Sequence, residues 1–121
     1  MISYQLKLEY CSAAKNTEYV RQLFFILIDE ISLHIRGVTE QRFYPEGLVL
    51  SMVLAEGYAS MYAHPSLDGI DIDIYSDSKN PELLDRCLNE AMTLFVPHSI
   101  RYIVTDRISM EIVAVDTWSK T

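Results

Sequence analysis

The sequence predicts an α+β fold, a two-layer α/β sandwich in which two helices cover one face of a largely antiparallel sheet. Several segments alternate between apolar and polar residues, which is the pattern of a half-buried strand. Only two segments show apolar residues at helical spacing. Half of the 121 residues are apolar, which is enough for a substantial core, and we expect one domain over residues 1–121.

The first predicted strand covers residues 2–10, where apolar and polar side chains alternate. The first predicted helix covers residues 15–35, because apolar residues recur there every three or four positions. Asn16 or Thr17 can cap the beginning of this helix, and Gly37 lies just past its end. The chain therefore starts with a strand and a long helix.

The middle of the chain is predicted to be mostly extended. Residues 38–44 form a short extended segment and residues 45–47, Pro-Glu-Gly, form a turn. The nearly continuous apolar run at residues 48–55 predicts a central strand that is covered on both faces. The pair at 56–57 interrupts this run, and residues 58–62 either continue the strand or return beside it.

The remaining elements are a loop, a strand, a helix and a hairpin. Residues 64–69 form the loop, and residues 70–75 alternate so regularly that they predict the clearest strand of the chain. The dipeptide 80–81, Asn-Pro, is a good helix start. Residues 100–105 and 108–115 then predict two strands of a hairpin.

One face of the predicted sheet has no helix left to cover it. Apolar residues on both sides of the strand at residues 48–55 favour a protein partner over water at this face. A second copy of the chain is the most common partner in such cases. We therefore expect a homo-oligomer, most simply a homodimer.

Composition and charge exclude several classes of protein. The formal net charge of −7 disfavours binding to the phosphate backbone of nucleic acids. No stretch of about 18 apolar residues could span a membrane, and residues 1–10 lack the pattern of a signal peptide. Cys11 and Cys87 show no metal-binding spacing. We expect a cytoplasmic protein with two reduced thiols.

Roughly residues 5–95 resemble the prokaryotic S-adenosylmethionine decarboxylases. That family carries, in order, an F-x-P-x-G segment, an apolar strand, E-S-H, a loop with a proline, and D-V-F/Y. Here residues 43–47 read FYPEG, Glu56 follows the apolar strand, Pro65 lies in the loop and residues 73–75 read DIY. The resemblance implies the fold of the family and a pocket for an adenosyl compound.

The residues that perform the chemistry of the family are absent. The family cuts its own chain at a serine, which becomes a pyruvoyl cofactor, and this serine falls on Gly57. Glycine has no side-chain atom that could attack the preceding carbonyl. The two histidines of the family fall on Tyr58 and Tyr62. Its proton-donating cysteine falls on Asp77, and its ribose-binding glutamate falls on Ser66. The resemblance therefore implies a divergent member without a pyruvoyl cofactor.

Phe43 and Glu56 are retained from the family pattern. In the family, the position of Phe43 stacks on adenine, so the expected ligand-binding residues are Phe43, Glu56 and Ser66. Phe43 also fits the role of a core aromatic residue, and Glu56 fits that of a solvated residue at a bulge. If the chain is an enzyme, the expected acid, base or positioning groups are Glu56, Tyr58, Tyr62 and Asp77.

Three functions remain open. The chain can be an uncut decarboxylase-like protein that binds S-adenosylmethionine, another adenosyl compound or a partner protein, for example as the regulatory subunit of an active homologue. It can be an enzyme with a different, cofactor-free reaction such as cleavage of the sulfonium, which acidic and aromatic groups attract. It can also share only the fold and serve in assembly.

The sequence gives little support for a metal site. His34, His64 and His98 are far apart and match no metal-binding motif. Asp71, Asp73 and Asp77 share one face of a predicted strand if that strand persists, and with Asp68 they form an acidic cluster. This cluster fits a site for a hard cation, a general acid/base pair or a solvated strand face, and we expect no metal.

Overall fold

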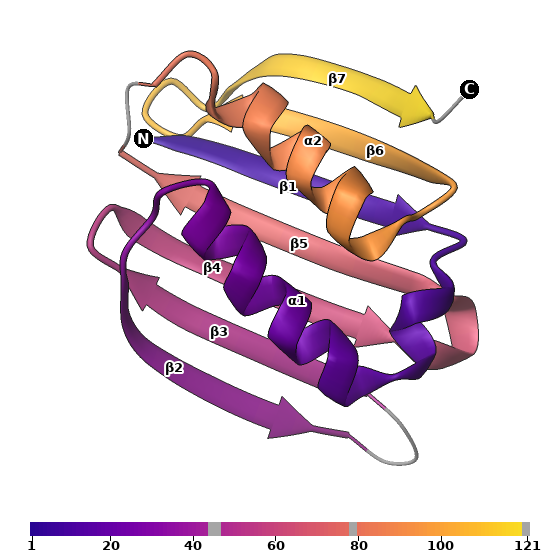
Figure 1. Cartoon of the computed structure of the whole chain (residues 1–121). Coiled ribbons are helices and arrows are strands. Elements are labelled where there is room, and N and C mark those ends of the chain that lie inside the picture. Colours follow the sequence, from indigo (N-terminus) through magenta and orange to yellow (C-terminus); the bar gives the residue numbers. More distant parts are fainter. Residues whose placement is uncertain (44–46, 78–79, 120–121) are drawn as a thin grey trace.

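Within residues 1–43, 47–77 and 80–119, which the structure describes, the computed structural model has one seven-stranded sheet with two α-helices on one face (Figure 1). The helices are α1 (Thr17–Glu30) and α2 (Leu83–Phe95). The strands are β1 (Ile2–Glu9), β2 (Ile35–Arg42), β3 (Leu48–Leu54), β4 (Gly57–His64), β5 (Gly69–Ser76), β6 (Ser99–Asp106) and β7 (Glu111–Ser119).

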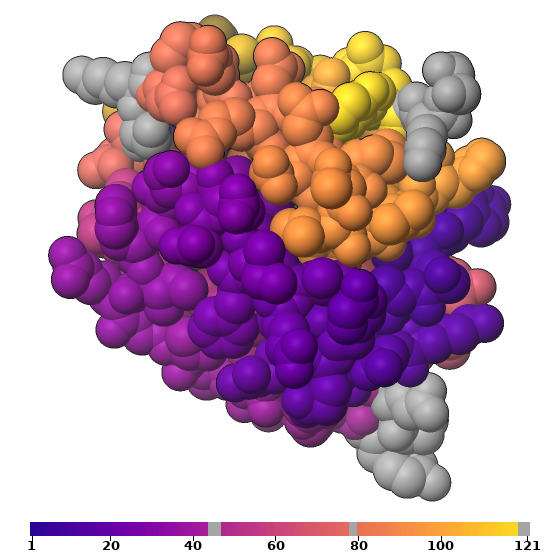
Figure 2. Space-filling view, in the orientation of Figure 1, coloured from indigo at the N-terminus to yellow at the C-terminus, as the bar shows by residue number. Residues whose placement is uncertain are grey.

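The sheet order is β2-β3-β4-β5-β1-β6-β7, and every neighbouring pair is antiparallel. Both helices lie on the same side, as Figure 1 shows, so the predicted two-layer α+β sandwich is confirmed. Figure 2 views this helix side, where the side chains of α1 and α2 close over the sheet. Neither helix of the described chain is long and apolar enough to cross a membrane.

The core lies between the helices and the sheet. The alternation along β5 places Ile70, Ile72 and Ile74 fully inside it. Phe24 of α1 and Phe95 of α2 pack into the same core from above. Burying an apolar side chain of this size contributes roughly 1.5–3 kcal/mol, so this layer supplies most of the driving force for folding.

The first helix is shorter than the predicted range of 15–35. The Asn16 carboxamide oxygen accepts a hydrogen bond from the Tyr19 N–H at 3.1 Å, which caps the beginning of α1. The helix ends at Glu30 because Ser32 takes a left-handed conformation with φ 63°. Gly37 is therefore not a helix cap, and it lies in β2 at an irregular register with β3.

The second half of the chain shows two similar shifts. The helix does not begin at Asn80-Pro81, because the Asn80 side chain accepts a hydrogen bond from the Glu82 N–H in a turn that precedes α2. The predicted second hairpin strand starts later, at Glu111, since the Asp106 carboxylate accepts the Ile108 N–H at 2.9 Å and holds the chain in a turn. Most of the predicted turn at 45–47 lies outside the described residues.

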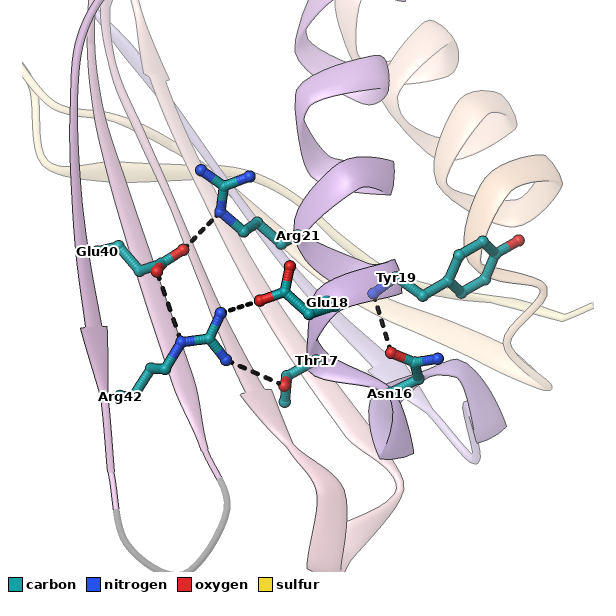
Figure 3. A network of polar contacts seen from close by, with 7 residues as sticks. All are labelled: Asn16, Thr17, Glu18, Tyr19, Arg21, Glu40 and Arg42. Carbon is teal, nitrogen blue, oxygen red and sulfur yellow. Dashed lines mark hydrogen bonds and ion pairs between the residues drawn. The ribbon is translucent and has the colours of Figure 1, made fainter.

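The edge strand β2 is attached to the beginning of α1 by charged side chains (Figure 3). Arg42 forms an ion pair with Glu18 and donates to the Thr17 hydroxyl at 3.3 Å. Arg21 of α1 reaches Glu40 of β2 at 2.6 Å. Each exposed pair is worth about 0–1 kcal/mol, so the network orients the edge strand more than it stabilises the fold.

The face of the sheet opposite the helices is uncovered in this chain. The prediction that β3 is covered on both faces is wrong for the single chain, because Ser51 and Val53 are exposed and only the alternate residues are buried. Val53 is 61 % exposed and Val115 of β7 is 60 % exposed. The same face also exposes the side chains of Tyr58 and Tyr62 on β4 and of Ile103 on β6.

Candidate functional site

The turn between β3 and β4 carries Glu56 and Gly57. Ala55 and Glu56 form the two turn residues, so the chain returns as β4 rather than continuing β3. The Ala55 N–H donates to the carbonyl oxygen of His34 at 2.8 Å, and the Asp77 N–H donates to the carbonyl oxygen of Glu56 at 2.8 Å. Neighbouring segments therefore hold this turn on two sides.

Gly57 is packed so tightly that no other residue fits without a backbone shift. Its φ is 153°, a conformation that L-amino acids rarely adopt. A Cβ atom at this position would lie 1.9 Å from the carbonyl oxygen of Tyr75, which is far inside van der Waals contact. It would also lie 3.3 Å from the Cα atom of Ser76. The glycine thus allows β4 and β5 to pair closely at this end of the sheet.

Glu56 is not a freely solvated residue, because His34 binds its carboxylate. The His34 N–H donates to Oε1 at 2.9 Å, and the His34 ring nitrogen Nδ1 lies 2.6 Å from Oε2. Desolvation raises the pKa of Glu56, but the hydrogen bonds from the ring and the backbone of His34 outweigh it and bring the pKa below its usual value. The carboxylate is therefore ionised at neutral pH.

Three rings lie in a row at the other end of β4. The ring of Tyr62 is stacked on that of His64, with centroids 3.8 Å apart and planes 10° apart. Phe43 is nearly parallel to Tyr62, with centroids 6.0 Å apart. Phe43 is 44 % exposed and is not a core residue. It therefore remains available as a stacking surface for a planar ligand.

The structure divides the predicted site residues into two groups. Glu56, Tyr58 and Asp77 lie at the β3–β4 turn, and we call them the turn group. Phe43 and Tyr62 lie at the far end of β4, and Ser66 is exposed in the short helix η2 (Pro65–Leu67) that follows; we call these three the ring group. At about 3.3 Å per residue, Glu56 and Tyr62 are roughly 20 Å apart along the strand. One copy of the chain does not bring the two groups together.

Aromatic contacts also shape the turn group. The ring of Tyr58 is stacked on that of Tyr75, with centroids 5.0 Å apart. The guanidinium of Arg107 lies 5.5 Å from the centroid of Tyr75 on its ring face. Asp77 is exposed just past the end of β5. The group thus combines carboxylates with electron-rich rings.

A cavity of about 580 Å³ lies on the uncovered face over β5, β1, β6 and β7. Its lining includes Lys7, Arg101, Asp71 and Asp73, from three neighbouring strands. Desolvation, and then the charge of Asp71, raise the pKa of Asp73 above its usual value. Within the described ranges, no set of three or more histidine, cysteine or acidic side chains is arranged to hold a metal ion.

Sequence reasoning did not connect His64 with Asp71. The two side chains meet on the uncovered face, where Nε2 of His64 lies 2.8 Å from Oδ2 of Asp71. The alternation of side chains along β4 and β5 places residues 62, 64 and 71 on the uncovered face. This alternation does not say which residues of the two strands lie opposite each other, so it could not predict the contact.

Comparison with known proteins identifies the family. The family model described as S-adenosylmethionine decarboxylase matches residues 5–108. The chain belongs to the S-adenosylmethionine decarboxylase family. The resemblance noted in the sequence is thereby confirmed, and β7 lies outside the matched range. Among proteins with curated descriptions, none matches this chain.

Two solved structures of decarboxylases share the fold. The adenosylmethionine decarboxylase from Aquifex aeolicus VF5 is 21% identical, with a TM-score of 0.75 over 88% of both chains. The Trypanosoma brucei AdoMetDC-delta26 monomer is 12% identical, with a TM-score of 0.61 over 85% of this chain and 45% of that chain. This chain therefore spans less than half of the trypanosomal protein, and both likenesses concern the fold.

The tight packing at Gly57 leads to a direct prediction. The substitution Gly57→Ala places a Cβ against the Tyr75 carbonyl in a conformation with positive φ, so it should lower the free energy of unfolding by about 2 kcal/mol or more. Urea denaturation measures this loss. Gly37→Ala is the matched control, because nothing lies within 4 Å of a Cβ there, and it should change stability by less than about 1 kcal/mol. Equal effects of the two substitutions would contradict the packing described for residue 57.

Proposed function

We propose that this chain is an S-adenosylmethionine decarboxylase-like protein that stays uncut, makes no pyruvoyl cofactor and binds an adenosyl ligand. The observation that carries the proposal is Gly57, at the position of the self-cleaved serine in the family pattern. This residue offers no nucleophile, and its contact with the Tyr75 carbonyl leaves no room for a side chain that would supply one. Self-cleavage by the family route therefore has no starting group.

The ring group supports binding of an adenosyl compound. The exposed Phe43 and Tyr62 present nearly parallel rings, and aromatic rings of this kind stack on a planar base. The carboxylates and the tyrosine of the turn group favour a positively charged sulfonium. The two groups together thus match the two ends of S-adenosylmethionine.

We further propose that a second copy joins the two groups. A two-fold axis parallel to the sheet and perpendicular to β4 places the ring group of one copy over the turn group of the other, which removes the separation of roughly 20 Å. The uncovered face carries the exposed apolar side chains that such sheet-on-sheet packing would bury. An active homologue with the same face could replace the second copy, which would make this chain a regulatory subunit.

A second candidate function is a cofactor-free reaction on the bound sulfonium compound. It is favoured by the carboxylate of Glu56, which His34 holds ionised, and by the tyrosines beside it. A sulfonium is already an activated leaving group, so its cleavage needs no pyruvoyl group. Chromatography of S-adenosylmethionine after incubation with the protein separates a binder from such an enzyme.

Ligand binding is tested by thermal denaturation with S-adenosylmethionine and with methylthioadenosine. At about 100 times the Kd, a ligand adds about 2.7 kcal/mol to the free energy of unfolding, which corresponds to several degrees in Tm. Phe43→Ala should remove this shift without lowering the Tm of the free protein, since Phe43 is exposed. Tyr19→Ala, at an exposed aromatic residue of α1, should keep it. The absence of any shift in the wild type would reject adenosyl binding.

The two-copy site is tested by sedimentation velocity. The wild type should sediment at twice the chain mass of 13.9 kDa. Val53→Asp places a charge on the uncovered face and should give monomers that lose ligand binding as well. Ile26→Asp, at an exposed residue of α1, should leave both properties unchanged. A wild type that is monomeric and still binds the ligand would refute the joined site.

A further inference from the structure

The sheet is wider than the helix layer that covers it. Seven strands at a spacing of about 4.8 Å span roughly 29 Å, whereas two helices of about 10–12 Å diameter cover roughly 20–24 Å. In Figure 1, α2 lies over β1 and β6, and β7 forms the edge of the sheet beyond it. A slot therefore runs between the outer flank of α2 and the helix side of β7.

A cavity of about 290 Å³ lies in this slot. Its lining includes the half-buried rings of Tyr102 on β6 and Trp118 on β7, which both pack against the core. Asp116 is directly opposite Tyr102 in the pairing of these strands, and Trp118 follows two residues later on the same face. Asp85 and Asn89 line the cavity from α2, one helical turn apart. Two aromatic rings and two carboxylates thus share one cavity.

The two carboxylates of this cavity are not neutralised by basic side chains of the described residues. The ion pairs of that part of the chain involve neither Asp85 nor Asp116. Oδ1 of Asp116 accepts a hydrogen bond from the Thr117 N–H at 2.7 Å. Desolvation, and then the charges of Asp116 and Asp85, raise the pKa of Tyr102 above its usual value. Both carboxylates therefore act on the same ring, and negative charge together with ring faces favours a cation.

We infer that this cavity binds a quaternary ammonium cation over the ring of Trp118. Tryptophan makes the strongest cation–π contact of the aromatic residues, and aromatic sites recognise quaternary ammonium groups in this way. The buried Leu88 adds apolar surface for the methyl groups of such a cation. The cavity volume lies just below the usual range for small-molecule sites, about 300–1,000 Å³, so it suits a ligand with one compact head group.

The cation site does not depend on the proposed adenosyl site. Tyr102 and Trp118 pack on the helix side of the sheet, whereas Tyr58 and Tyr62 are exposed on the uncovered face. Residues 116–118 also lie beyond residues 5–108, which the family model matches. The net charge of −7 attracts cations to the protein as a whole. The inference therefore goes beyond the proposed function and is tested separately from it.

Titration with choline and with 3,3-dimethyl-1-butanol tests the inference. The two probes have the same shape, and the alcohol has a neutral carbon in place of the charged nitrogen. Trp118 is the only tryptophan of the sequence, so its fluorescence reports directly on this cavity. At ionic strength matched with sodium chloride, choline should change this fluorescence and bind roughly 5- to 30-fold more tightly than the alcohol.

Three variants assign the preference to this cavity. Asp85→Asn combined with Asp116→Asn removes both charges and keeps the size of the side chains, so it should reduce the preference for choline at least about threefold. Trp118→Leu keeps an apolar side chain without a ring face, and isothermal titration should show a similar loss. Asp29→Asn, at an exposed carboxylate of α1, should retain the full preference.

A wild type that binds the two probes equally, or that binds neither, would overturn the inference. A preference that persists in the folded double variant and in folded Trp118→Leu would overturn it as well, since the cation would then bind elsewhere. These outcomes leave the proposed function untouched, because the shift in Tm with S-adenosylmethionine and methylthioadenosine tests adenosyl binding on its own.

Discussion

The close approach of β5 to the first residue of β4 is the constraint on which the rest of the structure depends. The carbonyl oxygen of Tyr75 occupies the space that a side chain of residue 57 would need. With glycine there, β4 can turn directly back from β3 and pair with β5 over its full length. The same pairing brings Tyr62 opposite Asp71 and Tyr58 opposite Tyr75. The residue on which the proposal of an uncut chain rests is therefore also the residue that sets the geometry of the uncovered face.

The two faces of the sheet have different physical roles. The helix side holds nearly all of the large buried apolar residues, including Phe24 and Phe95, and accounts for stability. The uncovered side carries charges, tyrosines and exposed valines that add little to the stability of a single chain. Asp73 is an example, because its pKa is raised by desolvation and by Asp71. A carboxylate in this setting destabilises the folded chain at neutral pH, which is consistent with a role in binding.

The fold could largely be predicted from the sequence, because apolar alternation in β1 and β5 and two helical stripes leave few arrangements of layers. The ends of elements could not. Ser32 ends α1 because it takes a left-handed conformation, which the residues around it do not predict. The Asp106 carboxylate accepts a hydrogen bond from the Ile108 N–H, so a turn precedes β7 and the strand begins later than predicted.

The site was only partly predictable for a different reason. Family positions identified Phe43, Glu56 and Tyr62 as residues of interest, but the distance between them depends on strand direction and register. The return of β4 along β3 places Glu56 and Tyr62 at opposite ends of a strand. The pairing of His64 with Asp71 depends on the β4–β5 register, which is a long-range property. Patterns that are local in sequence do not contain this information.

The claim that this decarboxylase relative remains a single covalent chain can be measured directly by mass spectrometry of the purified protein under denaturing conditions. The structure predicts one species near 13.9 kDa, stable on prolonged incubation, because residue 57 has no group that can attack the preceding carbonyl. Two fragments that cover residues 1–56 and 57–121, the second with a blocked keto-acyl terminus, would contradict the account.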